Sequence, residues 1–166
     1  MSDASTRTVR AAHLSDATAV QEISAEAYIP IYQAVIGAVP KPAHEDYAGR
    51  IGQGEVWMLE AGDGPAGVLV LEPKAGHLIV YSIAVRLRYQ GRGYGKLLLA
   101  FAEQRAASEG LAELRLYTNS RMGRNLAFYR SCGFSETGLR PHPSRPGEVV
   151  VDMAKAVSGT PADPNQ

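Results

Sequence analysis

Residues 90–96, with the sequence Gln-Gly-Arg-Gly-Tyr-Gly-Lys, combine residue types that are suited to binding phosphate. Alternating glycines let the backbone turn sharply and approach a ligand without a Cβ in the way. A helix is expected to begin directly after them, and the N–H groups and dipole of its first turn favour an anion. Arg92 and Lys96 add positive charge. We therefore expect this loop to hold the phosphates of a nucleotide-like cofactor.

The charge around this loop is uneven. The whole chain has no net charge, with 17 basic and 17 acidic residues, which argues against a general nucleic-acid binder. Residues 73–102 nevertheless contain no Asp or Glu, and their basic residues are Lys74, Arg86, Arg88, Arg92 and Lys96. Such a stretch is typical of a site for a small anionic ligand, and equally typical of a solvated loop beside an apolar strand.

Spacing excludes two of the phosphate-binding motifs that this loop could represent. A dinucleotide motif G-x-G-x-x-G that starts at Gly91 would need glycine where Lys96 stands. A P-loop G-x-x-x-x-G-K-[ST] that ends at Lys96 would need glycine at Gln90 and Ser or Thr at Leu97. The loop belongs to neither class.

The pattern that fits is [QR]-x-x-G-x-[GA], from Gln90 to Gly95, after an apolar strand and before a helix. It resembles the acetyl-CoA loop of the GNAT N-acetyltransferase superfamily. Residues 125–134 resemble a later helix of that family, whose signature ends in Tyr-x-x-x-Gly-Phe, here Tyr129 to Phe134. The two motifs occur in the expected order and spacing, and the resemblance covers roughly residues 7–155.

This resemblance implies acetyl-CoA as co-substrate and a direct attack of an amine on its thioester. The pantetheine arm would bind backbone groups of the strand, and the pyrophosphate would bind the loop. The cofactor-binding residues would be Ile83, Ala84, Val85, Gln90, Gly91, Arg92, Gly93, Tyr94, Gly95, Lys96 and Asn125. The family commonly uses the tyrosine at the position of Tyr129 as the general acid that protonates the leaving thiolate.

No general base is assigned. Some family members carry a Glu on the central strand where this chain has Ile79. The remaining candidates are an ordered water or one of Glu22, Glu26, Glu72, His44 and His77. Because that Glu is missing, a non-catalytic module that senses acyl-CoA remains the alternative function.

The acceptor is expected beside the first helices and the late strands, near Tyr28, Tyr32 and Tyr81. Residues 140–148, rich in Pro and Arg, either recognise a carboxylate-bearing acceptor or form a solvated turn. The partner is then a small-molecule or peptide amine, and abundance within the family favours the small molecule. A homodimer is compatible with the resemblance.

Composition limits the remaining classes. We expect a single domain over residues 7–157 between disordered ends at 1–6 and 158–166. The longest apolar runs are too short to span a bilayer, and the four histidines lack metal-ligand spacing, so neither membrane nor metal is expected. A lone cysteine, Cys132, and a polar N-terminus without a signal-peptide core indicate a cytoplasmic protein.

Periodicity and turn residues predict the elements that position these motifs. Strands are expected at 8–12, 56–60, 67–72, 78–85, 111–117 and 148–153, with 78–85 covered on both faces. Helices are expected from an N-cap at Ser15 to a break at Pro30, in a short piece before residue 50, after the glycine loop to Gly110, and from Met122 to Gly133. The order predicts an α/β (α+β) fold with a mixed sheet. The resemblance implies that this sheet is mostly antiparallel, splayed at its central strands and flanked by about four helices.

Overall fold

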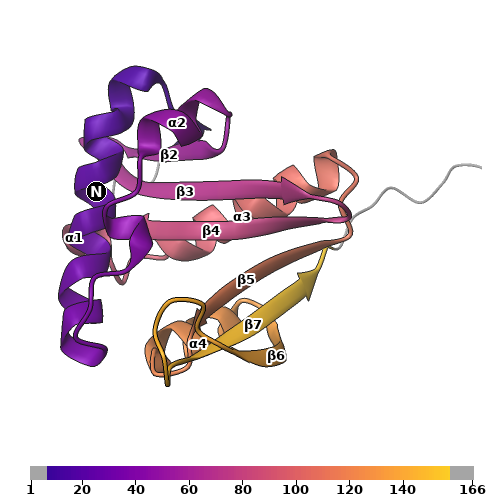
Figure 1. Cartoon of the computed structure of the whole chain (residues 1–166). Coiled ribbons are helices and arrows are strands. Elements are labelled where there is room, and N and C mark those ends of the chain that lie inside the picture. Colours follow the sequence, from indigo (N-terminus) through magenta and orange to yellow (C-terminus); the bar gives the residue numbers. More distant parts are fainter. Residues whose placement is uncertain (1–6, 158–166) are drawn as a thin grey trace, which may run out of the picture. The chain divides into compact units, whose positions relative to one another are not determined.

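Seven strands within residues 7–157, the part of the chain that the structure describes, form one sheet in this computed structural model. Their hydrogen-bonded order is β1-β2-β3-β4-β5-β7-β6 (Figure 1). The strands are β1 (Thr8–Ala11), β2 (Val56–Ala61), β3 (Gly64–Lys74), β4 (His77–Val85), β5 (Glu113–Asn119), β6 (Ser135–Pro141) and β7 (Val149–Ala156). The pairs β1–β2, β2–β3, β5–β7 and β6–β7 are antiparallel and β4–β5 is parallel, so the predicted mixed, mostly antiparallel sheet is confirmed.

The parallel pairing of β4 with β5 is short. Its register runs from His77↔Glu113 to Ile79↔Arg115, although β4 continues to Val85 and β5 to Asn119. Pairing therefore stops before either strand ends. The α-helices are α1 (Ala17–Val35), α2 (Tyr47–Gly52), α3 (Tyr94–Ser108) and α4 (Gly123–Ser131).

The chain divides into two compact units. The first contains the residues up to Leu71 and Ser82–Leu98, and the second contains Glu72–Tyr81 and the residues from Leu99 onward. Strands β3 and β4 and helix α3 each begin in one unit and end in the other. The predictions for 1–6 and 158–166 lie outside the described residues, and a single domain over 7–157 stays a prediction.

In the first unit, α1, the strands β2 and β3 and the start of α3 supply a mainly apolar core. Its most buried side chains are Val20, Ile23, Met58, Leu59, Val68, Leu69, Val70 and Leu98. Helix α1 begins at Ala17 and runs through Pro30 to Val35, so the predicted break at Pro30 is wrong. A proline inside a helix costs roughly 3 kcal/mol, which tertiary packing can outweigh. Here the rings of Tyr28 and Tyr32, one turn apart across the proline, pack with their centroids 5.7 Å apart.

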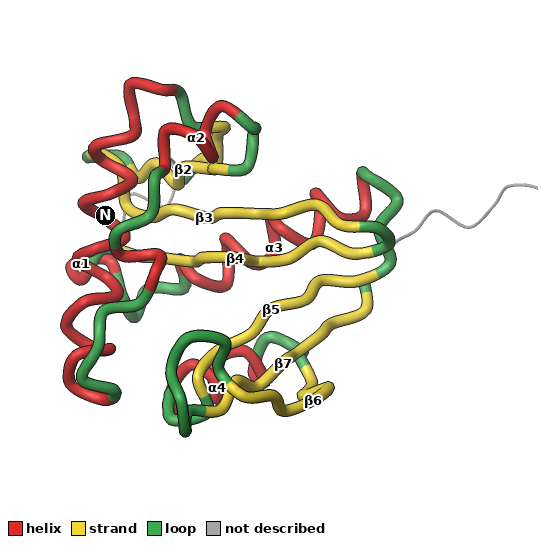
Figure 2. The backbone as a smooth tube through the Cα atoms, in the orientation of Figure 1, coloured by secondary structure: helices red, strands yellow, loops and turns green. Residues whose placement is uncertain are grey.

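In the second unit, helix α4 follows β5 and precedes the β6–β7 pair (Figure 2). Burial alternates along β5: Leu114 and Leu116 are buried, whereas Arg115 and Tyr117 are exposed. Helix α3 contributes Leu99, Ala102 and Ala106 to the buried side, and Met153 contributes from β7. The other face of these strands carries charged and polar side chains.

Two strand predictions need correction. Strand β6 is missing from the prediction because the residues of Ser135–Pro141 show no apolar alternation, and all except Arg140 are exposed. This segment is a strand because β7 pairs with it from Ser135↔Ala154 to Pro141↔Val149, with one register shift between Glu136 and Gly138. Arg140 therefore lies in a strand and not in a loop. Strand β4 is fully buried on one face only, since buried and half-buried residues alternate along it.

Candidate functional site

The glycine loop follows a short 3-10 turn, Leu87–Tyr89, and its last three residues already form the start of α3, which begins at Tyr94 and not after Lys96 as expected. Gly91 and Gly93 have φ angles of 77° and 82°, in the left-handed region that side chains other than glycine adopt at a cost. A Cβ added to either glycine would meet no atom within 4 Å. The backbone of this loop therefore adjoins open space, as a loop that receives a ligand must.

The basic residues of the stretch separate into paired and unpaired groups. Ion pairs join Lys74 to Glu72, Arg86 to Glu26 and Arg88 to Asp63, at 3.6, 3.8 and 3.6 Å. Arg92 and Lys96 form no salt bridge with any residue between 7 and 157. Arg92 lies with its guanidinium carbon 5.8 Å from the ring centroid of Tyr89. The positive charge that remains for an anionic ligand is therefore concentrated at the glycines.

Two buried tyrosines fix the ends of this loop. The rings of Tyr89 and Tyr94 meet edge to face, with centroids 5.4 Å apart. The Tyr89 hydroxyl donates a hydrogen bond to Asp63, which lowers the pKa of that carboxyl and raises the pKa of the tyrosine. Because the Tyr94 side chain is 6% exposed, any contact that Tyr94 makes with a cofactor falls to its backbone.

The backbone of β4 just before the loop is capped by side chains. The Tyr28 hydroxyl accepts the N–H of Ile83 at 3.1 Å and donates to the carbonyl of Ile83 at 3.0 Å. The side-chain amide of Gln90 donates to the carbonyl of Val85 at 3.0 Å. Ala84 points its carbonyl toward Gly67 of β3, where an added Cβ would lie 3.0 Å from that oxygen. The polar groups of Ile83 and Val85 are thus held by side chains that a ligand could replace.

The remaining predicted residues of the site belong to the second unit. Tyr129 and Asn125 lie one turn apart on α4, and both are half-buried. The Tyr129 ring packs edge to face on Phe134, with centroids 5.8 Å apart. Asn119 is buried, donates to Glu148 at 3.0 Å and accepts the N–H of Arg121 at 3.0 Å, so it closes the turn before α4.

The predicted acceptor residues are distributed over the two units, and their role in binding an acceptor stays a prediction. Tyr28 and Tyr32 lie together on α1 of the first unit, and Tyr81 is a half-buried residue of β4 in the second. Among the base candidates, Glu26 is occupied by Arg86 and by the N–H of Leu87 at 3.2 Å. In the described part of the chain no three His, Cys, Asp or Glu residues are grouped as metal ligands.

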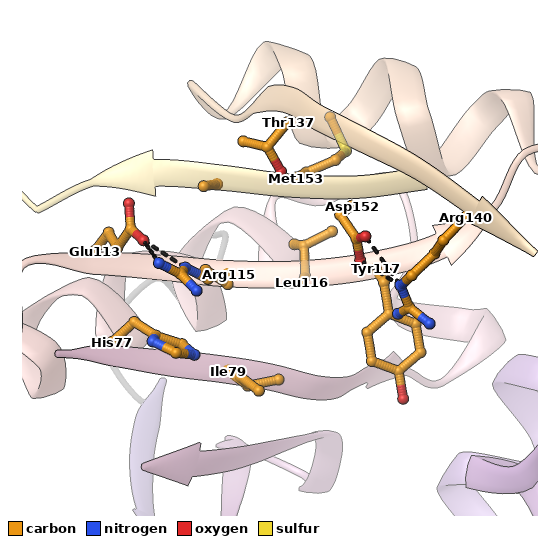
Figure 3. A pocket seen from close by; sticks show the side chains of 11 residues that line it. His77, Ile79, Glu113, Arg115, Leu116, Tyr117, Thr137, Arg140, Asp152 and Met153 are labelled. Atoms are coloured by element: carbon orange, nitrogen blue, oxygen red, sulfur yellow. Dashed lines mark hydrogen bonds and ion pairs between the residues drawn. The ribbon is translucent and has the colours of Figure 1, made fainter. Parts of the chain in front are cut away.

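Sequence reasoning missed a hollow of about 530 Å³ on the polar face of the second unit (Figure 3). It is lined mainly by side chains of β4, β5, β6 and β7. Its charged residues are Glu113, Arg115, Arg140 and Asp152, and Ile79 and Tyr117 also line it. The signals for this face were the alternating polar residues of β5 and the segment from Arg140 onward, but β6 could not be recognised from its sequence.

Comparison with known proteins identifies the family of this chain. A family model described as an acetyltransferase (GNAT) domain matches residues 52–136. The chain belongs to the GNAT acetyltransferase family. A GNAT relative, the uncharacterized N-acetyltransferase YvbK of Bacillus subtilis, is 30% identical over 115 residues, which cover 68% of this chain and 72% of that protein.

The GNAT fold is also shared with solved structures of lower identity. The ribosomal-protein-S18-alanine N-acetyltransferase of Escherichia coli has a TM-score of 0.74 and 22% identity, over 97% of this chain and 99% of that one. The PaiA N-acetyltransferase of Thermoplasma acidophilum, solved in complex with coenzyme A, has a TM-score of 0.70 and 17% identity. The match covers 91% of this chain and 99% of that chain. These likenesses confirm the predicted fold. No helix among residues 7–157 is long and apolar enough to cross a membrane.

Proposed function

We propose that this GNAT family member transfers the acetyl group of acetyl-CoA directly to a primary amine. The observation that carries the proposal is the loop after β4. Arg92 and Lys96, which have no salt bridge within the described chain, flank glycines whose Cβ positions are open. The pyrophosphate of coenzyme A would accept hydrogen bonds from the loop N–H groups and the first turn of α3.

The pantetheine arm would bind β4 in place of the side chains that cap it. Its amide groups can accept from the N–H of Ile83 and donate to its carbonyl, as the Tyr28 hydroxyl does. The carbonyl of Val85, which accepts from Gln90, offers a further position. In both places one hydrogen bond replaces another. The pantetheine arm can therefore bind β4 without leaving its backbone N–H and carbonyl groups unpaired.

Tyr129 is the general acid in this proposal. The amine nitrogen attacks the thioester carbonyl, the C–S bond breaks, and the thiolate takes the hydroxyl proton of Tyr129. Proton transfer from a tyrosine of pKa ~10 to a thiol of pKa ~8.5 is uphill by about 2 kcal/mol, which a catalytic step tolerates. The phenolate then recovers the proton that the acceptor nitrogen, positively charged after its attack as a neutral amine, releases when the amide forms.

Deprotonation of the acceptor needs a route as well. For an amine of pKa ~10.4 it costs about 4.6 kcal/mol at pH 7. The carboxylates of Glu26 and Glu72 are engaged in ion pairs, so the candidates that remain for this proton are Glu22, His44, His77 and an ordered water.

The alternative is a module that binds acyl-CoA and turns nothing over. One observation favours this alternative: the position at which some family members carry a Glu as base is occupied here by Ile79, which cannot accept a proton. Binding and turnover separate the two functions.

The test is thiol release from acetyl-CoA across a panel of primary amines. We expect release with at least one amine, and replacement of Tyr129 by Phe should lower kcat by about 10²-fold while the Kd of coenzyme A stays the same. If acetyl-CoA binds but no amine causes release of the thiol, the enzyme function fails and the acyl-CoA sensor is the function that remains. Failure of acetyl-CoA to raise the melting temperature would remove both functions. Unchanged kcat in Tyr129→Phe would remove Tyr129 from the mechanism.

A further inference from the structure

The hollow on the second unit contains two ion pairs at opposite ends (Figure 3). Arg115 pairs with Glu113, its neighbour two residues earlier on β5. Arg140 of β6 pairs with Asp152 of β7 at 2.9 Å. The lining therefore carries two positive and two negative side chains beside one histidine, His77. A ligand with several charges of one sign would be poorly matched to such a lining.

Arg140 is held in a way that leaves one edge of its guanidinium available. Its Nε donates to both carboxylate oxygens of Asp152, at 3.1 and 2.9 Å. The guanidinium carbon of Arg140 lies 5.0 Å from the ring centroid of Tyr117. Tyr117 stands opposite Asp152 in the β5–β7 ladder. The terminal nitrogens Nη1 and Nη2 donate to none of the residues that the structure describes. A planar fork fixed on one edge and one face is preorganised to bind a carboxylate with the other edge.

The part of the lining around Arg115 is small and apolar. Ala154 of β7 and Ile79 of β4 stand opposite Arg115 in the ladders on either side of β5. Thr137 of β6 also lines the hollow. At about 530 Å³, the hollow falls within the usual size of a small-molecule site.

We propose that this hollow binds the acceptor, and that the acceptor is a small amino-carboxylate whose carboxylate is held by Arg140. This inference rests on the proposed acetyl transfer, since the amine of the same molecule is the group acetylated. A molecule with one carboxylate and one amine is neutral overall when the amine is protonated, as the two ion pairs of the lining are. Strand β4 contributes Ile79 to this hollow and Ile83 to the proposed pantetheine contact. Asp152 and Tyr117 are positioning residues, because they act through the guanidinium.

The experiment compares kcat/KM for the common L-amino acids and for their carboxamides, with acetyl-CoA saturating. We expect wild type to prefer at least one amino acid over its amide, and Arg140→Gln to reduce that ratio about tenfold or more, mainly through KM. Comparing the ratio between wild type and variant cancels the different amine pKa values of acid and amide. Arg140→Lys should restore only part of the ratio, because it keeps the charge and loses the fork.

Arg105→Gln is the matched control. Arg105 lies on α3, its side chain is 38% exposed against 41% for Arg140, and it also forms an ion pair, with Glu109 at 2.8 Å. We expect no change in the ratio for this variant. An equal loss on acids and amides in Arg140→Gln, or a wild type that accepts amines but no amino acid, would overturn the proposal. The proposal would also be overturned if the enzyme preferred phosphoethanolamine over β-alanine and this preference depended on Arg140. The group bound by Arg140 would then be a phosphate and not a carboxylate.

A binding measurement keeps this inference distinct from the proposed function. N-acetyl-amino acids, the expected products, should shift the side-chain Nε–H signal of Arg140 in NMR spectra and leave that of Arg105 in place. If no amine is acetylated but this shift occurs, the transfer reaction fails and the carboxylate site stands. If acetylation occurs and no such shift is seen with the products of the acetylated amines, the carboxylate site fails alone.

Discussion

The hydroxyl of Tyr28 accepts a hydrogen bond from the backbone N–H of Ile83 at 3.1 Å and returns one to its carbonyl at 3.0 Å. It also accepts from the hydroxyl of Ser82 at 3.1 Å, so its donor and both acceptor positions are used. A side chain from α1 thus occupies the two backbone groups that an added strand would bind. Under the proposed function, coenzyme A and Tyr28 compete for Ile83.

Replacement of Tyr28 by Phe should therefore tighten coenzyme A binding. In the variant, the N–H and carbonyl of Ile83 no longer bond to the Tyr28 hydroxyl. The pantetheine arm can then bind these two groups without first displacing that hydroxyl. We expect the Kd of coenzyme A to fall about threefold to tenfold, measured by isothermal titration calorimetry. Tyr47→Phe is the control, because it also removes a tyrosine hydroxyl from the first unit, one that bonds to the carbonyl of Pro42. Weaker binding in Tyr28→Phe would show that this hydroxyl contacts the cofactor instead.

The charge of Arg92 and Lys96 should set the affinity for coenzyme A and its dependence on salt. We expect the double variant Arg92→Gln/Lys96→Gln to raise the Kd by about 10–100-fold at low salt, with a smaller ratio in 1 M salt because exposed charges are screened there. Arg88→Gln provides the comparison, since Arg88 belongs to the same stretch and pairs with Asp63 at 3.6 Å. If Arg88→Gln raised the Kd as much as Arg92→Gln/Lys96→Gln, the ion pair with Asp63 would not prevent a cation from contacting the ligand.

The open space beside Gly93 should matter for the ligand and not only for the fold. Gly93 and Gly110 have φ angles of 82° and 71°, and an added Cβ would meet nothing within 4 Å at either position. Replacement by Ala should thus lower the free energy of unfolding by a similar amount in both, about 1 kcal/mol. Only Gly93→Ala should weaken coenzyme A binding, by about tenfold or more. Unaltered affinity in Gly93→Ala would contradict the assignment of the loop.

The ion pair of Asp16 with Arg10 should contribute stability that depends on pH. The Arg10 guanidinium donates to both carboxylate oxygens of Asp16, at 2.8 and 3.1 Å, and lowers the pKa of Asp16 to about 2. A carboxyl with a lowered pKa in the folded state stabilises the protein above its ordinary value near 4, and this contribution is lost as the pH falls toward 2.

We expect Asp16→Asn to lower the free energy of unfolding by about 1 kcal/mol at pH 7, a value reduced by the partial exposure of Arg10, and by only a small part of that near pH 2, where the folded-state carboxyl is half protonated. Urea denaturation at several pH values measures the difference. Glu109→Gln, which removes the pair between Arg105 of α3 and the residue that follows this helix, should have a smaller effect at every pH. A difference for Asp16→Asn that stays as large at pH 2 as at pH 7 would point to lost packing instead of lost charge.

The local patterns of the sequence determined the glycine loop, the helix that follows it and the motif that ends in Gly133-Phe134. These features depend on residues close together in the chain, such as glycines that allow left-handed backbone at Gly91 and Gly93. The family, the mixed sheet and most strands followed from them and from apolar periodicity. The end of α1 and the strand β6 did not, because packing across Pro30 and pairing with β7 outweigh the local preferences.

Only the tertiary structure decided which groups meet. Tyr28 and Ile83 are 55 residues apart in sequence, and no local pattern predicts that the hydroxyl of one caps the backbone of the other. The separation of paired Arg88 from unpaired Arg92 depends on Asp63, which approaches from the hairpin between β2 and β3. The fork of Arg140 exists because β6, β7 and β5 lie side by side, so that Asp152 holds its edge and Tyr117 its face. Such contacts arise from long-range packing, which the order of residues along the chain does not display.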